Sequence, residues 1–245
     1  MSSKYLARIS FVGTAYHGSQ IQKNAVTVQS VFQEAIKDVL GYLPDLKFCS
    51  RTDSGVHARR FYISFSLENG MDCGKIMNAL NAKLPGDIRV NELTNVAEDF
   101  QARYSAKGKT YEYLIWNSKV MNPFLVNRAY QFSWPIDENE LNSVSSVFLG
   151  SHDFSSFCSV KSSVDEKVRC ITDISVTRCG DMVKISISAD GFLYNMARII
   201  VGALLQTVRG KLSREDLGLY LNGKARDNLL ITAPACGLYL SEVYY

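Results

Sequence analysis

The sequence predicts an α+β protein of two ferredoxin-like units that share a mostly antiparallel, mixed central sheet, with a groove between the units. Residues 4–96 follow the order strand, helix, strand, strand, helix, strand, which is the ferredoxin-like order. A similar order returns after a short basic segment, so a second unit is expected. Because 47% of the 245 residues are hydrophobic, the chain can bury the cores that two such units need.

Apolar spacing predicts the elements of the first unit. Residues 28–40 repeat apolar side chains at helical spacing, whereas residues 61–67 alternate apolar and polar ones, as a half-buried strand does. Residues 71–84 form a second predicted helix, which Pro85 and Gly86 end. The remaining predicted strands are residues 4–12, 46–50 and 88–96.

The second unit is predicted in the same way, with a boundary near residues 103–109 that divides the chain into subdomains 1–105 and 106–245. Asp137 is the expected cap of one helix, and a hairpin turns across residues 179–181. The predicted helices are residues 137–149, 192–208 and 214–221. The predicted strands are residues 110–116, 129–132, 171–178, 182–189 and 238–243.

Composition excludes several classes of protein. The net charge of +3 does not by itself indicate a polyanionic partner. The six cysteines form no CxxC pair and the three histidines no spaced zinc site, so we expect reduced thiols, a cytoplasmic protein and no metal. The apolar run 191–208 is interrupted by Asn195 and Arg198, so we expect a buried helix and no membrane span.

One loop between two predicted strands contains a carboxylate beside basic residues. Asp53 is followed by Ser54 and Gly55, which favour a tight turn. Read locally, Asp53 is a turn residue with Arg51 as a surface charge. The alternative is a displayed reactive group, because loops at strand ends often carry function. The basic neighbours that phosphate contact would use are Arg51, His57, Arg59 and Arg60.

A second unusual charge lies on a predicted helix. Arg198 is the charged residue in the middle of an otherwise apolar stretch, and burying a guanidinium is costly unless acceptors receive it. Asp53 is a candidate partner, which Arg198 would keep ionised and oriented. The alternative is that Arg198 extends to solvent. Gly202, one turn on, would let another backbone segment come close.

A basic loop leads into the strand that carries two tyrosines. Lys107 and Lys109 precede Tyr111 and Tyr113, which lie on one face of the strand. An aromatic ring beside a basic loop can stack on a base that has been extruded from RNA. For Tyr113 we expect packing on the sheet instead.

These features resemble the TruA family of tRNA pseudouridine synthases. The nucleophile motif of that family is similar to residues 50–58 of this chain, Ser-Arg-Thr-Asp-Ser-Gly-Val-His-Ala. The resemblance is collinear and covers almost the whole chain. The further matching segments are residues 13–20, 81–88, 100–106, 109–113, 150–154, 190–202, 232–234 and 237–240.

The resemblance implies a pseudouridine synthase fold with an RNA-binding cleft between its units, and isomerisation of uridine to pseudouridine in tRNA. It implies that Asp53 is the nucleophile, that Arg198 pairs with it and that Tyr111 stacks on the uracil, with a possible part in proton transfer. The substrate-binding residues would be Arg51, Thr52, His57, Leu238, Lys107 and Lys109. No cofactor or metal is implied. The family typically acts on positions 38–40 of the anticodon stem–loop, and usually as a homodimer.

The chain departs from the family pattern at three places. Ser50 replaces a usual Gly, Ser19 a usual Trp, and residues 235–236 a usual Pro and its neighbour. None of these changes removes a catalytic group, so we expect them to affect target choice more than chemistry.

Two alternative functions follow from the same residues. One is an RNA-binding or RNA-chaperone protein of this fold without turnover, which the intact Asp53, Tyr111 and Arg198 disfavour. The other is a metal-dependent phosphoesterase that uses Asp53 and His57. The chain disfavours it, because the sequence lacks a second set of spaced His and Asp ligands.

Overall fold

The computed structural model describes residues 3–159, 165–223 and 225–245. It is a mixed α+β structure whose strands are mostly antiparallel, so the predicted fold class is confirmed. The chain divides into two compact units, one formed by Met1–Lys107 with Tyr239–Tyr245 and the other by Gly108–Leu238. The sequence analysis had placed residues 239–245 in the second subdomain, whereas they belong to the first unit.

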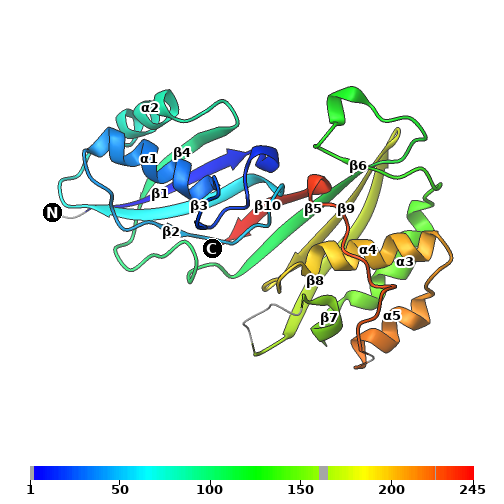
Figure 1. Ribbon diagram of the computed structural model, residues 1–245. Helices are drawn as coiled ribbons and strands as arrows, with labels where there is room; N and C mark the ends of the chain where they lie inside the picture. Colours follow the sequence, from blue (N-terminus) through cyan, green and yellow to red (C-terminus); the bar gives the residue numbers. More distant parts are fainter. Residues whose placement is uncertain (1–2, 160–164, 224) are drawn as a thin grey trace. The chain divides into compact units, whose positions relative to one another are not determined.

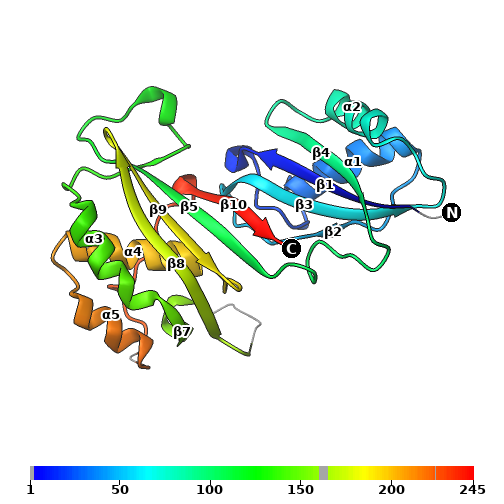
Figure 2. The same cartoon turned by 180° about the vertical axis from the view of Figure 1, so that it is seen from behind.

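The first unit has the predicted ferredoxin-like order. Its strands lie in the order β4-β1-β3, all antiparallel neighbours, and its two helices lie on one face of this sheet (Figures 1 and 2). The elements are β1 (Ser3–Phe11), α1 (Val28–Leu40), β2 (Lys47–Phe48), β3 (His57–Leu67), α2 (Cys73–Lys83) and β4 (Ile88–Val96).

The outer edge of β3 is shared by two short pairings. β2 pairs antiparallel with β3 at Ser64 and Ile63. The last strand, β10 (Leu238–Tyr244), pairs parallel with β3 at its other end, where Tyr239 lies opposite His57. The late segment of the chain thus completes the sheet beside the beginning of β3.

Local chemistry explains where α1 begins and ends. Thr27 is its N-cap and forms a reciprocal capping box with Ser30, so two backbone N–H groups of the first turn are satisfied. Gly41 ends the helix in the left-handed conformation at φ 79°, which glycine adopts without strain. Phe32 and Ile36 are buried on the face that covers the sheet.

The second unit is built around an antiparallel sheet in the order β5-β9-β8-β7, and β6 pairs parallel with β5. Helix α4 covers one face of this sheet, in front of it in Figure 1 and behind it in Figure 2. The elements are β5 (Gly108–Trp116), β6 (Tyr130–Gln131), α3 (Glu138–Ser145), β7 (Gly150–Asp153), β8 (Val168–Cys179), β9 (Met182–Ala189), α4 (Met196–Val208) and α5 (Arg214–Leu221).

Three helices differ from their predicted bounds, and α2 does so only by being two residues shorter at its start and one at its end. Helix α4 begins at Met196, four residues later than predicted, because Asn195 has a left-handed backbone at φ 63° and interrupts regular helix before it. Helix α3 ends at Ser145 and is followed by a short 3-10 turn over Ser146–Phe148. Asp137 caps α3 by accepting the N–H groups of Asn139 and Glu140, as predicted.

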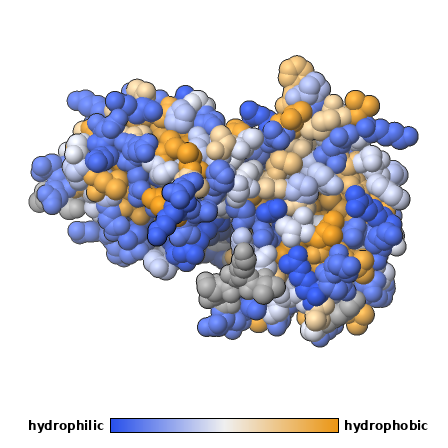
Figure 3. All heavy atoms as spheres, in the orientation of Figure 1, coloured by the Kyte–Doolittle hydropathy of each residue, from blue (hydrophilic) through white to orange (hydrophobic). Residues whose placement is uncertain are grey.

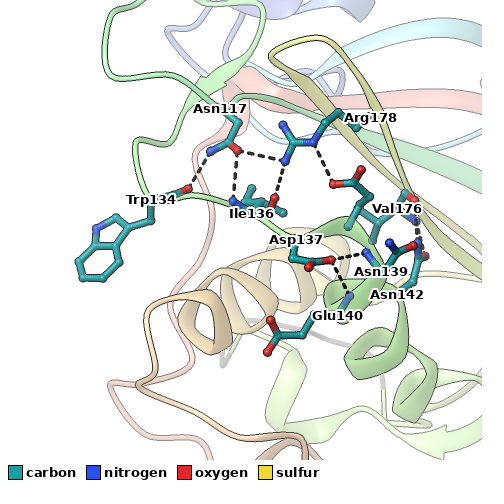
Figure 4. A network of polar contacts seen from close by, with 10 residues as sticks. Asn117, Trp134, Ile136, Asp137, Asn139, Glu140, Asn142, Val176 and Arg178 are labelled. Atoms are coloured by element: carbon teal, nitrogen blue, oxygen red, sulfur yellow. Dashed lines mark hydrogen bonds and ion pairs between the residues drawn. The ribbon is translucent and has the colours of Figure 1, made fainter.

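The loop between β5 and β6 begins at Asn117, which is bonded to the segment after β6, and it exposes apolar side chains. Arg178 of β8 donates to the carbonyl of Ile136 and to Asn117 Oδ1, and Asn117 donates to the carbonyl of Trp134 at 2.7 Å (Figure 4). Apolar surface gathers over this loop (Figure 3). Its exposed apolar side chains are Val120, Phe124 and Val126.

None of the helices that the structure describes has the length and apolar character that crossing a membrane requires.

Candidate active site

Asp53 lies in a tight turn of the first unit, directly before β3. The Val56 N–H donates to the Asp53 carbonyl at 3.1 Å, and Gly55 takes φ 79° at the position that needs a left-handed backbone. The Asp53 side chain is half-buried, so it is partly accessible from solvent. The predicted turn is confirmed, and the turn presents the carboxylate.

Residues 13–19 pack against this turn and form hydrogen bonds with it. The Tyr16 carbonyl accepts the Gly55 N–H at 3.2 Å and the Ser54 hydroxyl at 3.3 Å. A Cβ atom on Gly13 would lie 1.9 Å from the Val56 carbonyl oxygen, so a glycine is required for this close approach. The two segments are therefore in direct backbone contact.

Ser19 holds the residue before Asp53. Its hydroxyl accepts the Thr52 N–H at 2.7 Å, and its own N–H donates to the Thr52 carbonyl at 3.1 Å. The Ser19 side chain is buried, with 1% of its surface exposed. A departure from the family pattern that we expected to affect target choice thus contacts the backbone of the Asp53 loop.

Thr52 precedes Asp53 in the loop and His57 begins β3. Both were predicted to bind substrate, and both are buried. His57 is 1% exposed, and its Nδ1 accepts the Gly13 N–H at 2.9 Å, so the ring carries its proton on Nε2 in this contact. The ring stacks on Tyr239 with centroids 4.6 Å apart. The Thr52 hydroxyl is buried and has no hydrogen-bond partner among the described residues. His57 and the Thr52 backbone thus join the loop to residues 13–19 through hydrogen bonds.

The predicted basic cluster lies on the exposed side of the same unit. The side chains of Arg51, Arg59 and Arg60 are exposed. The Arg59 guanidinium lies 4.9 Å from the centre of the Tyr239 ring, and Arg60 forms an ion pair with Glu242. Arg51 and Arg59 thus carry exposed positive charge in the same unit as the Asp53 turn, where phosphate can contact it, whereas Arg60 is paired with Glu242.

In the second unit, Tyr111 and Tyr113 point to one face of β5, as predicted. Tyr111 is 7% exposed and its ring meets the Phe192 ring edge-on, with centroids 4.8 Å apart. The Tyr113 hydroxyl donates to the Pro234 carbonyl at 2.8 Å. Burial raises the pKa of Tyr113 far above its usual range, so this hydroxyl stays protonated. The prediction that Tyr113 packs on the sheet is confirmed.

Arg198 lies on α4 and is held by neutral oxygen atoms of its own unit. Its Nε donates to the Ala233 carbonyl at 2.8 Å, and its Nη1 donates to Asn195 Oδ1 at 2.9 Å. Arg198 is half-buried, so its guanidinium is held by two acceptors and is still partly exposed to solvent. The predicted close approach at Gly202 is confirmed, since a Cβ there would lie 2.1 Å from the Ile231 carbonyl oxygen.

The remaining predicted site residues differ in exposure. Lys107 is exposed and Lys109 is partly exposed, whereas Leu238, the first residue of β10, is buried. The first unit carries the predicted site residues Arg51, Thr52, Asp53, His57 and Lys107, and the second carries Lys109, Tyr111, Arg198 and Leu238.

The residues that position these groups could not be recognised as such from the sequence. Tyr16 and Ala233 are parts of matching segments without an expected role, and Ser19 is a departure from the family pattern that we expected to affect target choice. Glycines 13 and 18 were the available signal, because glycines that flank a short loop often mark close backbone contact. Among the residues that the structure describes, no group of three or more His, Cys, Asp or Glu side chains could hold a metal ion.

Comparison with known proteins identifies the family. A family model described as tRNA pseudouridine synthase matches residues 7–105 and 144–245. The chain belongs to the tRNA pseudouridine synthase family. The resemblance that the motifs around Asp53 indicated is thereby confirmed.

Relatives within this family match the chain over nearly its whole length. A tRNA pseudouridine synthase A of Acetivibrio thermocellus is 46% identical over 97% of this chain and 97% of its own length. A tRNA pseudouridine synthase A of Thermoanaerobacter sp. is 42% identical with the same two coverages. A chain in a solved Cbf5–Nop10–Gar1 complex is also similar, at 11% identity, 96% coverage of this chain, 57% of that chain and a TM-score of 0.37, which carries no argument about function.

Proposed function

We propose that the protein isomerises uridine to pseudouridine in tRNA, with Asp53 as the nucleophile. The observation that supports this most is the turn at Asp53, a half-buried carboxylate in a family member, whose backbone is hydrogen-bonded both before and after it. An aspartate does covalent work when it is ionised and fixed in place. The hydrogen-bonded turn supplies the fixed place.

The reaction rearranges the nucleoside without a net gain or loss of atoms. The bond between the ribose C1′ and the uracil N1 breaks, the uracil turns, and C1′ joins the uracil C5. The proton on C5 leaves and N1 gains one. In this proposal the Asp53 carboxylate forms a transient covalent bond to the nucleoside while the uracil turns.

The other groups bind and orient the substrate. Arg198 pairs with the Asp53 carboxylate, and its two bonds within the second unit fix the direction of the guanidinium. Tyr111 stacks on the extruded uracil, and Leu238 lines the uracil pocket. Arg51 occupies the space that the base leaves, and Lys107 and Lys109 contact phosphate. Stacking and phosphate contacts offset the few kcal/mol, roughly, that unstacking a base costs.

The substrate we propose is the anticodon stem–loop of tRNA, at positions 38–40, bound in a cleft between the two units of a homodimeric enzyme. Its relatives carry the name tRNA pseudouridine synthase A. A tRNA substrate and six cysteines that form no disulfide fit an enzyme of the cytoplasm.

The test compares Asp53→Asn with Asp99→Asn, which changes an exposed aspartate elsewhere in the same unit. Bulk tRNA is incubated with each protein, and pseudouridines are mapped by the mass shift that a carbodiimide adds. We expect product from the wild type and from Asp99→Asn. Asp53→Asn should form none, although its affinity for tRNA in a filter-binding assay is largely retained.

Each other outcome contradicts part of the proposal. Turnover by Asp53→Asn would exclude the nucleophile. A wild type that binds tRNA without modifying it would favour the RNA-binding alternative. Product at uridines outside positions 38–40 would correct the target and leave the chemistry in place.

A further inference from the structure

We propose that the Ser19 hydroxyl is a positioning group for the nucleophile, which holds Asp53 in its reactive orientation through the backbone of Thr52. This inference rests on the proposed role of Asp53. It assigns a task to a buried side chain at which the chain departs from the TruA pattern, so it concerns this protein in particular.

Both polar groups of the Thr52 backbone end on Ser19. The Thr52 N–H donates to Ser19 Oγ at 2.7 Å, and the Thr52 carbonyl accepts the Ser19 N–H at 3.1 Å. The Thr52 carbonyl lies in the peptide plane that leads into Asp53. The two bonds therefore fix the rotation of Thr52 and, with it, the direction in which the Asp53 side chain leaves the turn.

Ser19 is itself anchored to a rigid element. Its carbonyl accepts the Gln29 N–H at 3.0 Å, and the Gly18 carbonyl accepts the Val28 N–H at 3.2 Å. These are N–H groups of the first turn of α1, which have no partner within the helix. The nucleophile turn is thus connected through Ser19 to the N-terminal end of α1.

The segment that contains Ser19 also fits closely against the turn. Gly18 has φ 88°, and a Cβ on it would lie 2.5 Å from the Thr52 carbonyl oxygen. After Asp53 in the chain, the Tyr16 carbonyl accepts hydrogen bonds from the Ser54 hydroxyl and the Gly55 N–H. Asp53 is therefore held before and after by one short segment.

The bond at the Ser19 hydroxyl can be removed without changing the others. The bonds of Tyr16 and of the Ser19 N–H use backbone atoms, so they survive a substitution at position 19. The Thr52 N–H depends on the hydroxyl, and without it a buried donor is left without an acceptor. A small rotation of Thr52 is the expected response, and misplacing a reacting group slows chemistry sharply.

The experiment compares Ser19→Ala with Ser30→Ala in the full chain. Ser30 is a matched control because its hydroxyl accepts the Thr27 N–H at 3.0 Å within the α1 capping box. Single-turnover formation of pseudouridine is measured with enzyme in excess over tRNA, together with tRNA affinity by filter binding and the thermal midpoint. Both variants should lower the midpoint by similar amounts.

We expect the single-turnover rate to fall on the order of ten-fold in Ser19→Ala, with tRNA affinity within about two-fold of wild type. Ser30→Ala should keep the wild-type rate. Ser19→Thr, which retains a hydroxyl, should recover much of the lost rate. If Ser19→Ala does not fold, Ser19→Cys keeps the volume with a weaker acceptor and should give a reduced rate.

A wild-type rate in Ser19→Ala, or in Ser19→Cys where it is the variant that folds, would overturn the inference, as would an equal loss in Ser30→Ala. Asp53→Asn is measured in parallel. If Asp53→Asn is inactive and the Ser19 variants react at the wild-type rate, the positioning role fails and the nucleophile stands. If Asp53→Asn turns over, the proposed function fails independently of Ser19.

Discussion

Arg198 and Ala233 are joined by two hydrogen bonds that run in opposite directions. Arg198 Nε donates to the Ala233 carbonyl at 2.8 Å, and the Ala233 N–H donates to the Arg198 carbonyl at 3.0 Å. The next carbonyl, that of Pro234, receives the Tyr113 hydroxyl. Tyr113 of β5 and Arg198 of α4 thus hold neighbouring residues of the 232–234 segment. The Arg198 guanidinium therefore has a fixed direction before substrate binds.

Arg198→Ala should lower both stability and activity. It removes a charged donor from the Ala233 carbonyl and from Asn195, and hydrogen bonds of charged groups contribute about 2 kcal/mol. We expect that loss in the free energy of unfolding, measured with urea. The rate of pseudouridine formation should fall much further, because the proposed partner of Asp53 is gone. A stable and fully active variant would contradict both roles.

Tyr113→Phe is the control for that experiment. It removes the neighbouring bond to Pro234, which as a neutral hydrogen bond contributes about 1 kcal/mol. Because Tyr113 is placed in the sheet and outside the proposed chemistry, the single-turnover rate should change little. A large loss of rate in Tyr113→Phe would mean that the 232–234 segment, and not the guanidinium, governs activity.

Gly202→Ala should be strongly destabilising. The added Cβ would lie 2.1 Å from the Ile231 carbonyl oxygen, so backbone must move, at a cost of about 3 kcal/mol or more. Gly218 in α5 is the matched position, because nothing lies within 4 Å of its Cβ. Gly218→Ala should gain about 0.5–1 kcal/mol, since alanine favours a helix. Thermal unfolding of the two variants should shift in opposite directions.

His57→Phe should weaken the Asp53 turn. Phenylalanine keeps a ring beside Tyr239 but leaves the Gly13 N–H without its acceptor, which costs about 1–3 kcal/mol. His57→Asn offers an oxygen close to the position of Nδ1 and should recover part of the loss. If His57 instead contacted RNA directly, both substitutions would weaken tRNA binding and leave the thermal midpoint unchanged.

The ionisation of Glu138 should make the stability of the second unit depend on pH in the acid range. Its hydrogen bond with Arg178 at 2.9 Å holds the pKa of the carboxyl below its ordinary value of 4.5. A carboxyl whose pKa is lower in the folded state contributes stability above its unfolded value, and this contribution is lost as pH falls through the folded pKa. The wild type should therefore exceed Glu138→Gln in thermal midpoint at neutral pH. The difference should shrink below pH 4.5, and a constant difference would contradict the linkage.

Much of the fold followed from short-range patterns. Helix α1 and strand β4 have the predicted bounds, because caps, glycines and apolar spacing all act within a few residues. The start of α4 did not follow, since the left-handed Asn195 is fixed by its contacts with Arg198 and Ser159. The strand at β10 was predicted, but its place in the first unit was not, because its parallel pairing with β3 joins residues about 180 positions apart.

The candidate site divides in the same way. The motif around Asp53 and the lone charge of Arg198 are visible in the sequence, because residue type and local spacing carry them. The burial of His57 and Thr52 is not, because a polar residue in a loop can face either side of it. Ser19 was visible only as a departure from a pattern, and its contact with Thr52 depends on two segments that lie 33 residues apart.

The return of β10 to the first unit has a consequence for the order of synthesis. Residues 239–245 are made after the whole of the second unit, yet they pair with β3 beside the Asp53 turn. While residues 108–238 are being translated, β3 has no β10 to pair with at His57 and Ala58. Tyr239, which stacks on the His57 ring in the folded protein, has not yet been made. The Asp53 turn therefore reaches its final surroundings late, after the second unit has been translated.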